Sequence, residues 1–168
     1  MKKLLVISLS FLTLSFANTA NAQTFIKEFK AWGVFSIIQG GEKVCYMTST
    51  PSKQSGNYSK RGEPYMLVTH RQSGVSEVSV NSGYPFKSGS DVAVRIDNRH
   101  NYSFFTSKET PEMAWAKDSK TDKEVISKLK AGSSLTSKGY SRRGTYSVDS
   151  YSLAGFTAAF DKMTSSCK

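Results

Sequence analysis

The two cysteines, Cys45 and Cys167, carry the best-defined chemistry in this 168-residue sequence. Thiols in an exported chain meet oxidants that keep disulfides formed. A bridge between these two would close most of the chain, a constraint that the loop-entropy model values at about 4–5 kcal/mol. An intermolecular bridge and two free thiols are the alternatives. A catalytic cysteine is not indicated, because there is no Cys-x-x-Cys motif and no adjacent histidine.

The only histidines, His70 and His100, are the candidates for acid–base chemistry. A metal site normally takes three or four ligands, and neither histidine has a second His or Cys near it at ligand spacing. A hydrolase would need one of them to meet a serine and a carboxylate in space. The Gly-x-Ser-x-Gly elbow that often presents such a serine is missing from the sequence. We therefore expect no enzyme, no metal and no cofactor.

Basic residues cluster between positions 117 and 143, where eight Lys and Arg residues face three acidic ones. Within this span Lys138, Arg142 and Arg143 surround Tyr140. Guanidinium groups bind phosphate and sulfate oxygens in a forked geometry, so these three residues are the predicted anion-binding site. The alternative is a solvated helix face followed by a charged loop.

The first 22 residues have the pattern of a signal peptide. Lys2 and Lys3 precede an apolar stretch, and Ala20-Asn21-Ala22 is a small-x-small site, so cleavage is predicted after Ala22. Removal would lower the net charge from +10 to +8 and leave no transmembrane anchor. An exported basic protein is expected in the periplasm or outside the cell. There the natural partner is an anionic envelope or cell-surface component, and nucleic acid is not expected.

The remaining residues, 23–168, are predicted to form a single domain of mainly β structure. Short alternating segments separated by Gly, Pro and Asn indicate antiparallel strands, for example 29–38, 43–50, 65–70, 75–80 and 91–97, and residues 51–62 read as an exposed loop. Helices are expected at about 121–131, begun by a Thr121–Glu124 capping box, and at 152–166, capped by Ser152. Gly132 is expected to end the first helix. The predicted fold is a β-sandwich or a flattened barrel with two short helices.

An apolar stripe marks the second helix. Its members recur at helical spacing and end at the second cysteine; they are Leu153, Phe156, Phe160, Met163 and Cys167. A helix with such a stripe would close the fold if its end were bonded to an early strand.

Several residues, taken in order, resemble one known bacterial family. They are Trp32, Cys45, Ala114-Trp115, the segment Ile-Ser-Lys-Leu-Lys-Ala-Gly at 126–132, and the block Tyr-Ser-Leu-Ala-Gly-Phe-Thr-Ala-Ala-Phe at 151–160. The chain is similar here to the invasion-associated locus B family of small exported proteins. This resemblance covers essentially all of residues 23–168. It implies a compact β-sandwich-like domain with a non-catalytic role, linked in some members to host-cell invasion.

The resemblance also bears on the cysteines. Many members of the family have a cysteine where this chain has Ser36, so a bridge between neighbouring strands is impossible here and Cys45 is free to pair with Cys167. The function expected from the sequence is thus a non-enzymatic interaction module with a basic surface. A periplasmic small-molecule binding protein, with a closed apolar pocket, is the first alternative, and an envelope hydrolase using His70 or His100 is the second.

Overall fold

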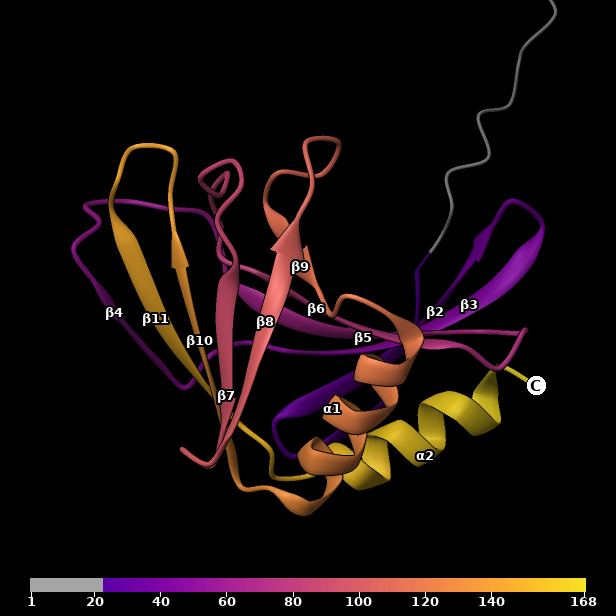
Figure 1. Ribbon diagram of the computed structural model, residues 1–168. Coiled ribbons are helices and arrows are strands. Elements are labelled where there is room, and N and C mark those ends of the chain that lie inside the picture. Colours follow the sequence, from indigo (N-terminus) through magenta and orange to yellow (C-terminus); the bar gives the residue numbers. More distant parts are fainter. Residues whose placement is uncertain (1–22) are drawn as a thin grey trace, which may run out of the picture.

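The computed structural model describes residues 23–168; the predicted signal peptide and its cleavage after Ala22 lie outside these residues. The described chain forms eleven strands and two helices (Figure 1). The strands are β1 (Thr24–Phe29), β2 (Trp32–Gln39), β3 (Glu42–Ser49), β4 (Lys53–Gly56), β5 (Tyr65–Arg71), β6 (Ser76–Asn81), β7 (Val92–Ile96), β8 (His100–Thr106), β9 (Met113–Trp115), β10 (Ser134–Tyr140) and β11 (Tyr146–Ser152). The helices are α1 (Ser119–Ala131) and α2 (Phe156–Ser166).

All the strand pairs are antiparallel and follow the order β1-β2-β3-β5-β6-β9-β8-β7-β10-β11-β4. Within the described residues β1 and β4 are the two edges of this open sheet, and they do not pair with each other. The predicted mainly β, sandwich-like fold is confirmed. The alternative of a flattened barrel is wrong, because the sheet does not close.

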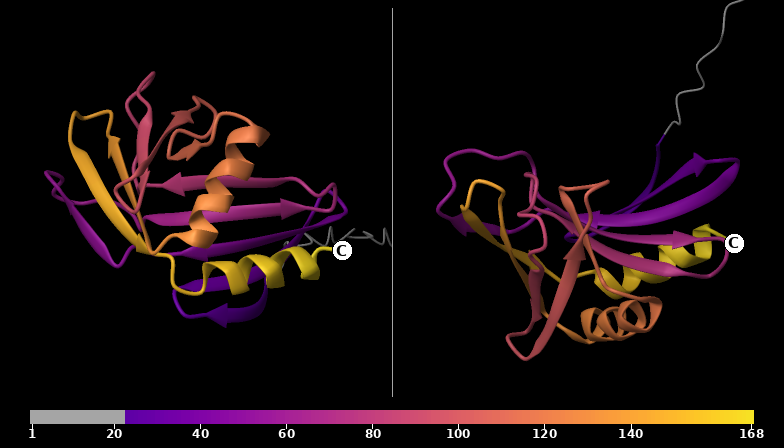
Figure 2. Two further views of the ribbon diagram at one scale, coloured as in Figure 1. Left: turned by 60° about the horizontal axis from the view of Figure 1, so that its bottom comes forward. Right: turned by 45° about the horizontal axis from the view of Figure 1, so that its top comes forward.

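The sheet bends where β8 passes from one neighbour to the next. Val92 to Ile96 pair with the body of β8, whereas the last β8 residues, Phe105 and Thr106, pair with β9. Figures 1 and 2 show the strands beyond this point, β7, β10, β11 and β4, standing across the direction of β2, β3, β5 and β6. Both helices pack on the same face of the first half of the sheet.

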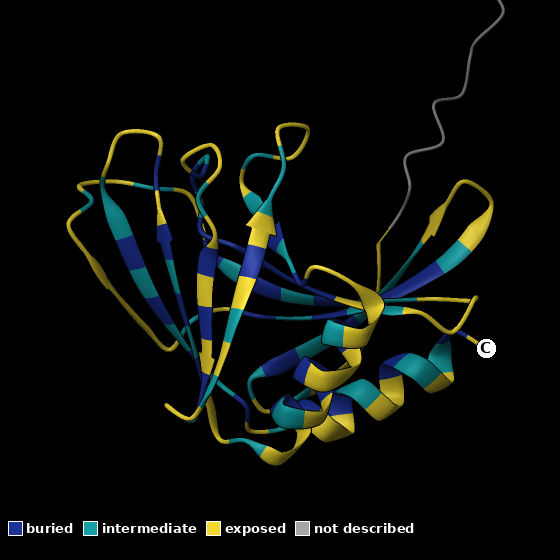
Figure 3. Ribbon diagram, in the orientation of Figure 1, coloured by how far each residue is buried: buried dark blue, intermediate teal, exposed yellow. Residues whose placement is uncertain are grey.

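The core lies between the two halves of the sheet and under the helices. Alternation places the even residues of β7 inside, so Val92, Val94 and Ile96 are buried while Ala93 and Arg95 are exposed (Figure 3). Trp32 of β2 is fully buried and packs edge-on against Phe156 of α2, with ring centroids 5.0 Å apart. Its indole N–H donates to the Ser152 carbonyl at 3.1 Å. These contacts attach the terminal helix and the end of β11 to β2.

The first helix begins two residues earlier than the predicted 121–131. Asp118, rather than Thr121, is the N-cap: its carboxylate accepts the Thr121 amide at 2.8 Å and the Thr121 hydroxyl at 2.7 Å. The Thr121–Glu124 capping box is therefore wrong, because Asp118 already occupies the bonding position. Gly132 follows the helix in an extended conformation with φ −91° instead of the left-handed one. Glycine is needed there for space, since an added Cβ would lie 2.9 Å from Ile96 and 3.0 Å from Leu153.

The second helix spans 156–166 and not 152–166. Ser152 is the last residue of β11, where it pairs with Ser134, and Gly155 takes the N-cap position with φ 89°. The β10–β11 pairing thus includes Ser152, the residue predicted to cap the helix. The predicted stripe is buried at Leu153, Phe156, Met163 and Cys167, and Phe160 is half-buried.

Two further boundaries differ from the sequence expectation. The predicted strand 29–38 is the end of β1, a turn and most of β2, because Lys30 adopts a left-handed φ of 55° and reverses the chain. The segment 51–62, expected to be a loop, contains β4, which pairs with β11 through Lys53–Gly56. Its polar sequence fits a short edge strand with every residue exposed.

Candidate functional site

The predicted disulfide is present between Cys45 on β3 and Cys167 at the end of α2, with Cα atoms 5.7 Å apart and a sequence separation of 122. Both residues are buried, and the described residues contain no other cysteine. Ser36 lies directly opposite Cys45 on the neighbouring strand. The partner of Cys45 therefore comes from the terminal helix instead of the adjacent strand, and the bond fixes α2 to the sheet.

A basic cavity of about 390 Å³ is the strongest candidate site. Three segments meet at it: 58–61 after β4, 83–85 after β6, and the turn 141–145 between β10 and β11. Its lining holds four cationic residues and no carboxylate; the residues are Tyr58, Lys60, Arg61, Gly83, Tyr84, Pro85, Ser141, Arg142, Arg143 and Thr145. We call this set the basic cavity. Figure 1 shows the β10–β11 turn well away from α1.

Backbone hydrogen bonds hold the three segments together. The Gly62 amide donates to the Gly83 carbonyl at 2.8 Å, and the Arg142 amide donates to Pro85 at 3.1 Å. Gly83 has φ 72°, and an added Cβ would overlap the Gly62 carbonyl, so only glycine allows the first two segments to approach this closely. The turn itself is closed by the Gly144 amide bonding Ser141 at 3.0 Å. The backbone under the charged side chains is thus fixed in place.

Arg61 differs from the other cations because it is buried. Its side chain is 3% exposed and forms a two-pronged ion pair with the fully buried Asp149 of β11, in which Nη1 donates to Oδ2 at 2.7 Å and Nη2 donates to Oδ1. Nη1 also donates to the Ser82 carbonyl at 3.0 Å, and Nη2 donates to Gln54 at 2.8 Å. The guanidinium carbon lies 4.5 Å from the centre of the Tyr58 ring. The remaining donor, Nε, is buried without a partner.

The other three cations of the cavity, Lys60, Arg142 and Arg143, are exposed, and none pairs with a carboxylate of the described chain. Lys138 does not line the cavity; its amine lies 5.0 Å from the centre of the Tyr146 ring and 5.4 Å from that of Tyr140. The structure therefore keeps the predicted Arg142–Arg143 pair and replaces Lys138 with Lys60 and Arg61.

Sequence reasoning missed Lys60 and Arg61 because they lie more than 80 positions before the arginine pair in a polar segment that looked like an exposed loop. The available signal was a second basic dipeptide, Lys60-Arg61, flanked by glycine and an aromatic residue, as is the dipeptide at 142–143.

His70 meets a serine, as the hydrolase alternative requires. Its Nδ1 lies 2.8 Å from the Ser76 hydroxyl, its direct partner across β5 and β6, and both residues line a hollow of about 500 Å³. Burial lowers the pKa of His70. Within residues 23–168 no carboxylate bonds its ring, and His100, which begins β8 opposite Ile96, bonds no hydroxyl. In the same residues no group of three potential ligands is placed to hold a metal.

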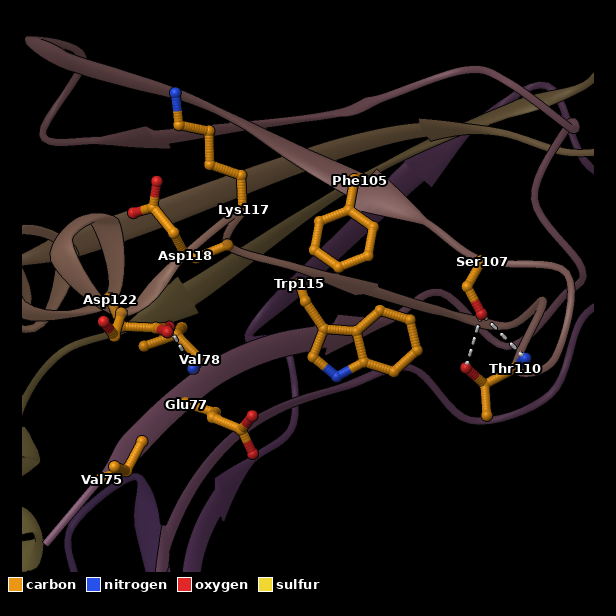
Figure 4. Close-up of a pocket in the computed structure, with 12 residues that line it drawn as sticks. Val75, Glu77, Val78, Phe105, Ser107, Thr110, Trp115, Lys117, Asp118 and Asp122 are labelled. Carbon is orange, nitrogen blue, oxygen red and sulfur yellow. Dashed lines mark hydrogen bonds between the residues drawn. The ribbon is translucent and has the colours of Figure 1, made fainter.

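An aromatic hollow of about 430 Å³ lies between β6, β8, β9 and the start of α1 (Figure 4). The rings of Phe105 and Trp115 lie beside each other with centroids 5.8 Å apart. On the helix side Asp122 accepts the Val78 amide at 2.8 Å, and burial raises the pKa of this carboxyl to about 6. This hollow opens to solvent, as do the other four of about 390–500 Å³. None of these five is the closed apolar pocket expected of a small-molecule carrier.

Comparison with known proteins shows the lineage. The family model described as invasion associated locus B (IalB) protein matches residues 32–164. The chain belongs to the invasion-associated locus B family. The resemblance predicted from Trp32, Cys45 and the 151–160 block is therefore confirmed. No curated protein matches the sequence.

Among solved structures, the IalB fold seen here is similar to the crystal structure of invasion-associated protein B from Bartonella henselae. The TM-score is 0.60 at 18% sequence identity, and the match covers 83% of this chain and 94% of that one. At this identity the likeness concerns the fold. Neither helix of the described region is long and apolar enough to cross a bilayer.

Proposed function

We propose that this IalB-family chain is an exported, non-catalytic interaction module that binds an anionic component of the envelope or of a cell surface through the basic cavity. The observation that carries the proposal is the convergence of Lys60, Arg61, Arg142 and Arg143 on one fixed hollow without a lining carboxylate. The disulfide supports export, since such bonds persist in oxidising compartments.

Charge alone would not select this cavity, because the basic span 117–143 also contains the lysines of α1. The lysines of α1, in contrast, have acidic neighbours. Lys130 pairs with Asp161 at 3.0 Å, and the N-cap Asp118 and the helix residues Asp122 and Glu124 lie close in sequence to the remaining lysines. The cavity has no such compensation beyond Asp149, which neutralises only Arg61. Its field therefore favours anions more strongly than that of any single exposed lysine.

The test is retention on an immobilised sulfated polymer across a salt gradient. We expect Arg142→Ala/Arg143→Ala to elute at clearly lower salt than the unmodified protein, because two forked contacts to sulfate are lost. The matched control is Lys120→Ala/Lys123→Ala on α1, which removes the same charge from exposed positions outside the cavity. Equal loss of retention in both double variants would show that net charge, and not the cavity, governs binding.

A second candidate, an envelope hydrolase, is favoured by the 2.8 Å contact between His70 and Ser76. A lowered pKa keeps the imidazole neutral and able to accept the serine proton. Incubation with a fluorophosphonate probe distinguishes the candidates: a hydrolase would be labelled at Ser76, and labelling would disappear in Ser76→Ala but not in the nearby Ser73→Ala. A non-catalytic module leaves all three proteins unlabelled.

A further inference from the structure

Four features of the basic cavity favour binding of one oxyanion at a defined site over non-specific attraction of a charged polymer. The first is its construction from three segments that bond to each other through Gly62, Gly83, Pro85 and Arg142. Groups held on a fixed backbone lose less freedom when they bind, so a small ligand can be recognised by few contacts.

The second feature is the inner wall. Arg61 pairs with Asp149, and its guanidinium lies over the Tyr58 ring, so its position does not depend on a ligand. It lines the cavity, its side chain is almost completely buried, and its Nε–H has no acceptor among the residues described. Its terminal N–H groups are already bonded to Ser82, Asp149 and Gln54, so Arg61 contributes a fixed positive charge to the wall, and its buried Nε–H reports on an anion bound nearby.

The third feature is the rim. Lys60, Arg142 and Arg143 supply three positive charges that no described carboxylate pairs, and the adjacent Ser141 and Thr145 hydroxyls, which bond each other at 2.7 Å, are uncharged. Two guanidinium forks and one ammonium suit a tetrahedral group with several oxygens and a charge near −2.

The fourth feature is size. The volume of about 390 Å³ lies within the range of small-molecule sites, and it is many times the roughly 30 Å³ that one water occupies in the liquid. A phosphate or sulfate group alone would leave much of it empty. The half-buried Tyr58 ring in the wall provides surface for a carrier such as a sugar ring, whereas Tyr84 is buried and bonds Gly139 and Ser147.

Resting on the proposed function, we infer that the basic cavity binds the phosphate or sulfate monoester end group of a carbohydrate. The ester oxygens face Lys60, Arg142 and Arg143, and the carrier lies against the Tyr58 ring. The sulfated polymer of the retention experiment is then bound through individual ester groups.

The test is NMR titration of the full mature protein at constant ionic strength, observing the Nε–H signal of Arg61. The probes are inorganic phosphate, glucose 6-phosphate and, as the uncharged control, glucose. We expect both phosphates to shift this signal, with half-saturation at lower concentration for glucose 6-phosphate, and glucose to leave it unchanged. Arg142→Gln/Arg143→Gln should weaken glucose 6-phosphate binding about tenfold or more, because charge-assisted contacts are lost.

An Arg61 signal that glucose 6-phosphate does not move would overturn the inference, as would half-saturation by inorganic phosphate at an equal or lower concentration. If the polymer experiment still depends on Arg142 and Arg143 in that case, the proposed function stands and only the discrete site is lost. If neither experiment depends on them, both proposals fail. The two exposed arginines are chosen because replacing them leaves the Arg61–Asp149 pair intact.

Discussion

Arg61 and Asp149 form a buried, two-pronged ion pair that joins the segment after β4 to the middle of β11, with side chains 3% and 0% exposed. The pair places a cation in the wall of the basic cavity and connects that wall to the core. It also supports the edge of the sheet, because Arg61 donates to Gln54 of β4.

Asp149→Asn is therefore expected to lower the free energy of unfolding by about 3–5 kcal/mol, since it leaves the Arg61 charge buried and unpaired. Urea unfolding measures the change. The matched control is Asp161→Asn, which disrupts the exposed pair with Lys130 and should cost no more than about 1 kcal/mol. Similar losses in the two variants would contradict the role given to the buried pair.

Gly83 is expected to be irreplaceable for the cavity. Gly83→Ala introduces a Cβ that overlaps the Gly62 carbonyl, so the 58–62 segment must move away, and we expect both lower stability and weaker retention on a sulfated polymer. Gly74→Ala is the control, because Gly74 has a similar φ of 82° but open space around the added atom. The control variant should lose only about 1–2 kcal/mol through backbone strain at positive φ. A Gly83 variant no less stable than this control would mean that the close approach is unimportant.

The bond between Cys45 and Cys167 should contribute about 2–5 kcal/mol to stability by restricting the unfolded chain. We expect the reduced protein and the Cys45→Ala/Cys167→Ala variant to unfold at similarly lowered urea concentrations. Thiol titration of the denatured, unreduced protein should find no free thiol. Two titratable thiols per chain would refute the pairing.

Asp122 should make stability fall as pH rises. Its native pKa of about 6 lies above the ordinary value of 3.8 because of burial, so the native state keeps this proton to a higher pH than the unfolded chain does. Ionisation then costs stability as pH rises from 4 to about 6. Relative to the unmodified protein, Asp122→Asn should gain on the order of 2 kcal/mol between pH 4 and pH 7, because one pKa unit corresponds to about 1.4 kcal/mol. Unfolding curves at both pH values measure this, and a constant difference would contradict it.

Local patterns in the sequence were sufficient for the β-rich class and the buried face of the last helix. Alternation at Val92, Val94 and Ile96 and the spacing of Phe156 and Met163 express burial directly, so these predictions were confirmed. Helix starts were less predictable, because Asp118 and Thr121 are both competent caps and the structure uses Asp118, which bonds Thr121 itself. Ser152 failed as a cap because its pairing with Ser134 extends β11, a contact between distant residues.

The candidate site was predictable only in part for the same reason. Arg142 and Arg143 are adjacent in sequence, so their cluster was visible. Lys60 and Arg61 reach them only because β4 pairs with β11 and because Gly62 meets Gly83, relationships that no local pattern contains. Lys138 was included by its nearness in sequence, although strand alternation directs it toward the Tyr140 and Tyr146 rings.

The most direct measurement of the central claim is amide NMR shift mapping during titration with a short sulfated oligosaccharide. If the basic cavity is the binding site, the largest shifts fall on three separate segments, 58–62, 83–85 and 141–145, and saturate together. Shifts centred on the lysines of α1, between 117 and 130, would contradict the account.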